Sequence, residues 1–133
     1  MGISLGRAAV QSRLAILVVE DDPAQREAYA ELLRLDGHEV TAVNDGQAAL
    51  QHAAMKHYDL VLSDLLMPGM TGDELRNQLN ARGCAPKRFM LMSATVVSAI
   101  GGNGVTDLLC LHKPFHPDEL SRAVADCAVS LAV

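Results

Sequence analysis

The residues best suited to chemistry in this sequence each follow a short, mostly apolar run. An acidic triplet comes directly after the run at 15–19, a single acid follows the run that ends at Ser63, and a hydroxyl and a lysine close two later runs. Carboxylates that converge disfavour one another's ionised form, and a hard divalent cation such as Mg²⁺ relieves that repulsion. The residues concerned are Glu20, Asp21, Asp22, Asp64, Ser93 and Lys113.

This set of side chains would suit phosphoryl transfer. A carboxylate beside bound magnesium can act as a nucleophile and form an aspartyl phosphate. The phosphoryl oxygens then need positive charge and a hydrogen-bond donor, which Lys113 and Ser93 can supply. Catalysis of this kind rests on positioning and electrostatics. The plainer alternative is that strands simply end in polar loops, which explains one acid per strand end but explains the whole combination less well.

Alternating strands and helices would bring these residues together. The apolar run at 15–19 is typical of a strand covered on both faces, and helix signals follow it: Asp22 as N-cap, Pro23 in the first turn, Gln25 at capping-box spacing, and Gly37 as the stop. Further strands are predicted at 39–43, 59–63, 89–92 and 108–111, and further helices at 47–56, 71–82 and 117–131. The helix at 71–82 opens with a second capping box, Thr71 with Glu74.

Strands that alternate with helices indicate an α/β domain whose parallel sheet has helices on both faces. Ligands bind such a sheet beyond the carboxyl ends of its strands, where the polar residues fall. The segment 96–107 should hold the fourth helix, but it contains Gly101, Gly102 and Gly104. Each interior glycine costs a helix about 1 kcal/mol relative to alanine, so we expect this helix to be short or irregular.

Length and composition fit one domain and exclude some functions. The chain has 133 residues, half of them hydrophobic, which is enough for one sizeable core. Its net charge of −5 argues against nucleic-acid binding, and no apolar run approaches the roughly 20 residues of a membrane span. Its three cysteines match neither a metal site nor a CxxC pair, so we expect buried thiols in a reducing cytoplasm: Cys84, Cys110 and Cys127.

Four pieces of the sequence point to one family. They are ILVVEDDP at 16–23, LVLSDLLMPGMTG at 60–72, FMLMSA at 89–94 and HKPF at 112–115. Each alone is weak, but their order and spacing are those of the receiver domain of bacterial two-component response regulators, which the chain resembles from about Arg13 onward. The resemblance implies a flavodoxin-like, doubly wound, five-stranded sheet of order 2-1-3-4-5. We therefore expect an arm or linker at 1–13 and a receiver domain at 14–133.

On the phosphoryl side, the resemblance implies a role for each matching residue. Asp64 takes the position of the phosphoacceptor, Ser93 that of the switch hydroxyl, and Lys113 that of the family's lysine before a cis-prone Pro114. The implied donor is a histidine kinase or a histidine phosphotransfer protein. The domain would catalyse only its own phosphorylation and dephosphorylation, signal to a downstream protein, and stand alone or form part of a larger protein.

On the metal side, the resemblance implies a magnesium site. Asp21 looks like the direct ligand, and Glu20 looks like its partner, often acting through water. Asp64 also belongs to this site, and the backbone carbonyl of Leu66 looks like the group that completes it. We expect Asp22 to cap the helix more than to bind metal.

The sequence also departs from the family pattern. Cys110 stands where the family usually has an aromatic residue, three positions before the lysine, and the fourth helix is doubtful. Both departures suggest that output proceeds through ordering of the segment 96–107. They also keep open a pseudo-receiver that acts as a constitutive interaction module. A magnesium phosphatase is a second alternative, but it would need a second acid where Leu66 stands.

Overall fold

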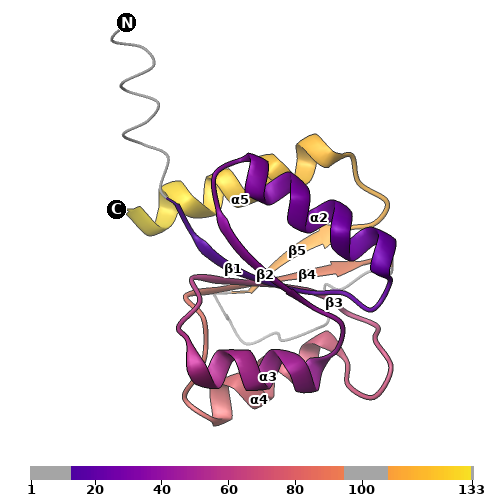
Figure 1. Ribbon diagram of the computed structural model, residues 1–133, viewed down its shortest axis with the longest axis vertical. Helices are drawn as coiled ribbons and strands as arrows, with labels where there is room; N and C mark the ends of the chain where they lie inside the picture. The colour runs from indigo at the N-terminus through magenta and orange to yellow at the C-terminus, as the bar shows by residue number, and fades with distance from the viewer. Residues whose placement is uncertain (1–12, 95–107, 133) are drawn as a thin grey trace, which may run out of the picture.

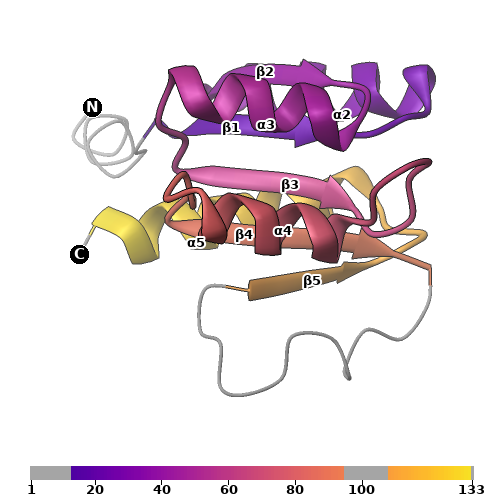
Figure 2. The same cartoon turned by 90° about the horizontal axis from the view of Figure 1, so that it is seen from below.

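The computed structural model describes residues 13–94 and 108–132, and five strands in these ranges form one parallel sheet of order β2-β1-β3-β4-β5 (Figures 1 and 2). The strands are β1 (Ala15–Val19), β2 (Glu39–Val43), β3 (Leu60–Asp64), β4 (Arg88–Ser93) and β5 (Leu108–His112). The helices are α2 (Pro23–Leu35), α3 (Gly46–Met55), α4 (Gly72–Ala81) and α5 (Pro117–Ala132). The predicted sheet order is confirmed.

Helices cover both faces of the sheet, as predicted. Figure 1 shows α2 and α5 on one face and α3 and α4 on the other. Alternate residues of β1 divide between the two cores: Ile16 and Val18 pack with α2 and α5, whereas Leu17 and Val19 pack with α3 and α4. Because both faces of β1 are buried, its sequence is a continuous apolar run instead of an alternating one.

Side-chain caps fix where the helices begin. Asp22 Oδ1 accepts a hydrogen bond from the Ala24 N–H at 3.3 Å, so the expected capping role of Asp22 is confirmed. Thr71 and Glu74 form the predicted capping box at the start of α4. The other expected capping box, between Asp22 and Gln25, is wrong, because the Asp22 N–H donates to Glu20 and the Gln25 side chain binds Lys113.

The expectation of three buried cysteines holds only for Cys127. Cys84 is half-buried and Cys110 is exposed. Cys110 lies on β5, an edge strand, between Leu109 and Leu111, which both pack toward α2 and α5. Since successive side chains of a strand point to opposite faces, Cys110 faces away from that core.

Two sequence-based expectations concern residues outside the described ranges. One is the short or irregular fourth helix at 96–107, and the other is the arm at 1–13, of which only Arg13 is described. Within residues 13–94 and 108–132, no helix is long and apolar enough to cross a membrane.

Candidate functional site

The predicted site residues meet where the parallel strands end. Glu20 follows β1, Asp64 is the last residue of β3, Ser93 is the last residue of β4, and Lys113 follows β5. Figure 2 shows the arrowheads of these strands pointing toward one side of the sheet. Residues separated by more than 90 positions in the sequence therefore come into contact, as the 3.2 Å between Lys113 Nζ and Glu20 Oε1 shows.

Three carboxylates form an acidic cluster at this edge. One oxygen from each of Glu20, Asp21 and Asp64 lies within 4.8 Å of the other two. Glu20 is buried, with 1% of its surface exposed, Asp64 is half-buried, and Asp21 is exposed. The cluster therefore runs from the protein interior to solvent, and its oxygens are the ligands that Mg²⁺ prefers.

Burial and crowding favour protonation of the two inner acids. Burial raises the pKa of the Glu20 carboxyl, an effect that the hydrogen bond from the Asp22 N–H at 3.1 Å partly opposes and the charge of Asp64 reinforces. Burial also raises the pKa of Asp64, against the attraction of Lys113, and the charge of Asp21 adds to that increase. Ionised carboxylates this close repel one another, so the cluster needs a positive charge beside it.

Lys113 supplies positive charge to the inner pair. Its Nζ lies 3.2 Å from Glu20 Oε1 and 3.4 Å from Asp64 Oδ1. Burial lowers the pKa of this ammonium, but the charges of Glu20 and Asp64 outweigh the burial, so the pKa lies above its ordinary value. Lys113 is therefore a permanent cation at the site. The peptide bond to Pro114 is cis, as the resemblance to the family implied.

Two side chains of α2 complete the surroundings of Lys113, and neither was predicted from the sequence as part of the site. Gln25 Oε1 accepts a hydrogen bond from Lys113 Nζ at 2.9 Å and another from the Tyr29 hydroxyl, also at 2.9 Å. The i, i+4 spacing places Gln25 and Tyr29 on one face of the helix. That spacing was a usable signal for the pair, but it did not show that the pair faces the lysine.

Ser93 and Leu66 lie at the same edge. Ser93 is buried, with 4% of its surface exposed, and its backbone carbonyl accepts the Lys113 N–H at 2.8 Å. Leu66 lies two residues beyond Asp64, and its side chain is exposed. Gly72 packs closely against the end of β3: a Cβ at Gly72 would lie 2.5 Å from the backbone oxygen of Asp64. This contact requires glycine at the start of α4.

The protein-family model for the response regulator receiver domain matches residues 16–125 of the chain. The chain belongs to the response regulator receiver family. FleR, a response regulator protein of Pseudomonas aeruginosa, is 46% identical over 113 residues, which make up 83% of this chain and 24% of FleR. The chain spans only about a quarter to a third of the length of such curated relatives.

Solved receiver structures share the fold. The chemotaxis response regulator CheY4 of Vibrio cholerae superposes with a TM-score of 0.75 at 25% identity, covering 87% of this chain and 99% of CheY4. The receiver domain of the sensor histidine kinase PA1611 of P. aeruginosa has a TM-score of 0.70 at 27% identity, covering 88% of this chain and 98% of that one. That structure holds a magnesium ion in its active-site cleft. Membership in this receiver family gives the chain a signalling role of the two-component type.

Proposed function

We propose that this receiver domain is a phosphorylation switch that accepts a phosphoryl group on Asp64 in a magnesium-dependent step. One observation carries the proposal: the half-buried Asp64 carboxylate lies within 4.8 Å of the acidic pair Glu20 and Asp21 and 3.4 Å from the Lys113 ammonium. A carboxylate nucleophile needs an ionised oxygen that the phosphoryl donor can reach, and the oxygens of the phosphoryl group need positive charge beside them.

The acidic cluster fits magnesium. Its three carboxylates converge within 4.8 Å and include the buried Glu20, whose ionised form is costly beside another acid. Asp21 and Asp64 would hold the ion, with Glu20 as their partner and the Leu66 backbone carbonyl as a further oxygen. When bound, magnesium would neutralise charge on the carboxylates and on the phosphoryl oxygens.

Asp64 is better placed for the nucleophilic role than its two neighbours. Glu20 is almost fully buried, and its two carboxylate oxygens are engaged by Lys113 and by the Asp22 N–H. Asp21 is exposed. Asp64 combines partial access with the ammonium of Lys113, which is what an acceptor of phosphoryl groups requires.

The transfer itself asks little of the protein. An Asp64 carboxylate oxygen forms a bond to phosphorus as the bond from phosphorus to the donor breaks. With a phosphohistidine donor, the imidazole nitrogen keeps the electron pair and takes a proton from solvent; with acetyl phosphate, acetate leaves as the anion. Lys113 then holds a phosphoryl oxygen through its ammonium, and the Ser93 hydroxyl donates to another.

The partners follow from the same proposal. The donor is a histidine kinase or a histidine phosphotransfer protein, and the recipient of the signal is a downstream protein in the cytoplasm. The domain catalyses only its own phosphorylation and dephosphorylation.

Mass spectrometry after incubation with acetyl phosphate and Mg²⁺ tests the proposal. We expect the wild-type chain to gain the mass of one phosphoryl group, and we expect Asp64→Asn or excess chelator to abolish the gain. Asp126→Asn, an exposed acid on α5, is the matched control and should label normally. If the wild-type chain fails to label with every phosphoryl donor tried, the phosphorylation switch is refuted and the constitutive module is favoured. Rapid hydrolysis of many donor molecules per chain would favour a phosphatase.

A further inference from the structure

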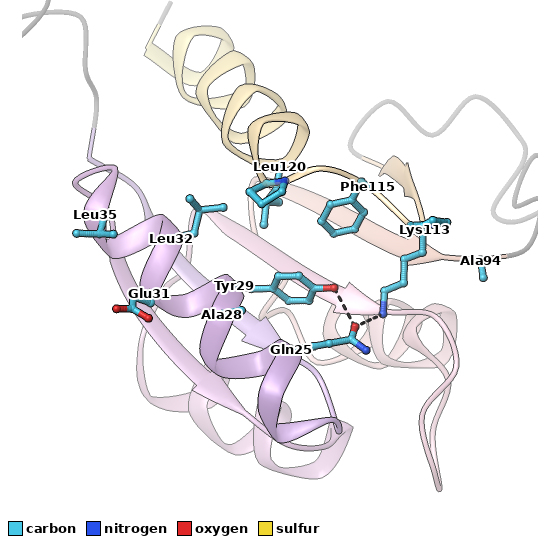
Figure 3. A pocket seen from close by; sticks show the side chains of 12 residues that line it. Gln25, Ala28, Tyr29, Glu31, Leu32, Leu35, Ala94, Lys113, Phe115 and Leu120 are labelled. Atoms are coloured by element: carbon cyan, nitrogen blue, oxygen red, sulfur yellow. Dashed lines mark hydrogen bonds between the residues drawn. The ribbon is translucent and has the colours of Figure 1, made fainter.

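The ammonium of Lys113 is bound by a third group that is neither an acid nor part of the acidic cluster. Figure 3 shows the Gln25 amide reaching from α2 to Lys113, with the Tyr29 hydroxyl on the same amide. The Gln25 Oε1 to Nζ distance of 2.9 Å is shorter than the distances to Glu20 and Asp64, which are 3.2 and 3.4 Å. Gln25 is thus the nearest acceptor of this ammonium among its three described partners.

The chemistry of the three groups fixes how the amide is oriented. An ammonium only donates hydrogen bonds, so the amide atom that faces it must be the oxygen. The Tyr29 hydroxyl can donate to that same oxygen, as its 2.9 Å distance indicates. With both donors on Oε1, the Gln25 side chain is held from two sides in one orientation.

Tyr29 is itself held in place. Its ring stacks on Phe115, with ring centroids 5.6 Å apart and planes 29° apart. Lys113 Nζ lies 6.0 Å from the centre of the Tyr29 ring, within the range of a cation–π attraction. Tyr29 therefore faces the lysine with its ring, while its hydroxyl donates to the Gln25 amide that binds the ammonium, and both side chains come from α2.

A Lys113 ammonium has three protons and three described acceptors: Gln25, Glu20 and Asp64. An incoming phosphoryl oxygen can accept a hydrogen bond from the ammonium only if one of these three acceptors loses its own. The contact to Asp64 is the longest, and it is the carboxylate that the phosphoryl group modifies. The contact to Gln25 can therefore persist while the third proton moves to the phosphoryl oxygen.

We propose that Gln25 is a positioning residue that holds the Lys113 ammonium in reach of the phosphoryl group, and that Tyr29 orients Gln25. This inference rests on the proposed phosphorylation of Asp64. Without the amide, only the two carboxylates hold the ammonium, and the nearer one is the buried Glu20. The ammonium then shifts toward Glu20 and away from the phosphoryl oxygen, which slows transfer.

The surroundings make truncation at Gln25 a clean test. Gln25, Tyr29, Lys113 and Phe115 line a cavity of about 700 Å³ between α2 and the start of α5 (Figure 3). Because the amide borders open space, its replacement does not force a tightly packed core to rearrange. Gln25→Met keeps the length and volume of the side chain and removes the acceptor, whereas Gln25→Glu keeps an acceptor oxygen.

The experiment compares rate constants for labelling of Asp64 by acetyl phosphate at saturating Mg²⁺, with thermal melting of each variant as a check on folding. We expect Gln25→Met to label about tenfold more slowly, the loss typical of one hydrogen bond to a charged group. Tyr29→Phe, which retains the ring on Phe115, should label about threefold more slowly. Gln25→Glu should recover most of the rate, and Glu27→Gln, an exposed neighbour on α2, should match wild type.

The double variant Gln25→Met/Tyr29→Phe separates positioning from general structural damage. Because Tyr29 acts through Gln25, the double variant should label no more slowly than Gln25→Met alone. Independent losses that multiply would refute the role of Tyr29. If wild type labels and Gln25→Met labels at the same rate, the positioning role is wrong while the switch stands; if wild type does not label at all, both proposals fail together.

Discussion

Replacement of Lys113 by methionine should destabilise the domain, and the loss should depend on pH in a way set by Glu20. Methionine retains most of the length of the side chain and removes the ammonium that lies 3.2 Å from Glu20 Oε1. Glu20 has 1% of its surface exposed, so water cannot take the place of the lost cation. Removing one partner of a buried pair typically costs about 3–5 kcal/mol, because a charge is left buried and uncompensated.

The structure sets an upper limit on that loss. At an effective dielectric constant of about 20, unit charges at the 3.2 Å and 3.4 Å distances from Lys113 to Glu20 and Asp64 each attract by about 5 kcal/mol. The folded variant cannot recover this attraction, but it can avoid leaving the buried Glu20 charge unpaired by protonating Glu20. From the ordinary value of 4.5, that protonation at pH 7.5 costs about 4 kcal/mol, at 1.36 kcal/mol per unit. The expected loss at pH 7.5 is therefore about 3–4 kcal/mol.

Acid should reduce the loss. The pKa of Glu20 is already raised by burial in the wild type, and it must rise further without Lys113. An acid whose folded pKa exceeds its unfolded pKa costs no stability below the unfolded value and weakens the fold as the pH rises toward the folded value. At pH 5.5, one unit above 4.5, protonation of Glu20 costs only about 1.4 kcal/mol, which becomes the new limit.

Urea denaturation followed by circular dichroism, in chelator at pH 7.5 and at pH 5.5, measures both differences from wild type. Lys87→Met is the matched control, because Lys87 forms a more exposed ion pair with Asp59 at 3.5 Å. That control should lose less than about 1 kcal/mol at either pH. Equal losses for Lys113→Met at the two pH values, or a loss as small as that of Lys87→Met, would refute the reasoning.

Two further perturbations test other parts of the structure. His38 Nδ1 accepts the Leu14 N–H at 3.2 Å, and burial lowers the pKa of His38, so stability should fall as the pH drops below 6.5, by up to about 1.4 kcal/mol at pH 5.5. Denaturation of His38→Gln should lack this part of the slope; an unchanged slope would contradict the assignment. Gly72→Ala places a Cβ 2.5 Å from the Asp64 backbone oxygen and should cost about 2 kcal/mol or more in urea denaturation. At Gly46, also at a helix start, the nearest atoms to an added Cβ belong to the Met70 side chain and none of them to the backbone, so Gly46→Ala should cost less; equal losses would count against the backbone clash.

The sheet was predictable because its strands are buried on both faces. Parallel strands under two helical layers read as short apolar runs, and the predicted 39–43 strand agrees with β2, Glu39–Val43. Helix bounds were predicted to within a residue or two, as for the helix expected at 47–56 and found at Gly46–Met55. Burial differences within the edge strand were not predictable, since the pattern around Cys110 does not reveal which face the core occupies.

The convergence of the acids and the lysine was also predictable, for a topological reason. The carboxyl ends of parallel strands share one edge, so residues after β1, β3 and β5 must approach one another. The partners of Lys113 on α2 were not predictable in this way. Gln25 and Lys113 are separated by 88 positions, and their contact depends on how α2 is rotated on the sheet. That rotation is set by packing of Ala30 and Leu33 against the core, which no local pattern records.

Charge and position can be separated at this site because different side chains control them. Lys113 supplies the charge that compensates Glu20 and Asp64, so its loss must affect both stability and phosphoryl transfer. Gln25 supplies no charge and borders a cavity, so Gln25→Met should leave the free energy of unfolding within about 1 kcal/mol of wild type while labelling slows. A site that works by charge alone would tolerate Gln25→Met in both measurements. A site that works by positioned charge must show the two variants diverging, with Lys113→Met impaired in both and Gln25→Met impaired only in labelling.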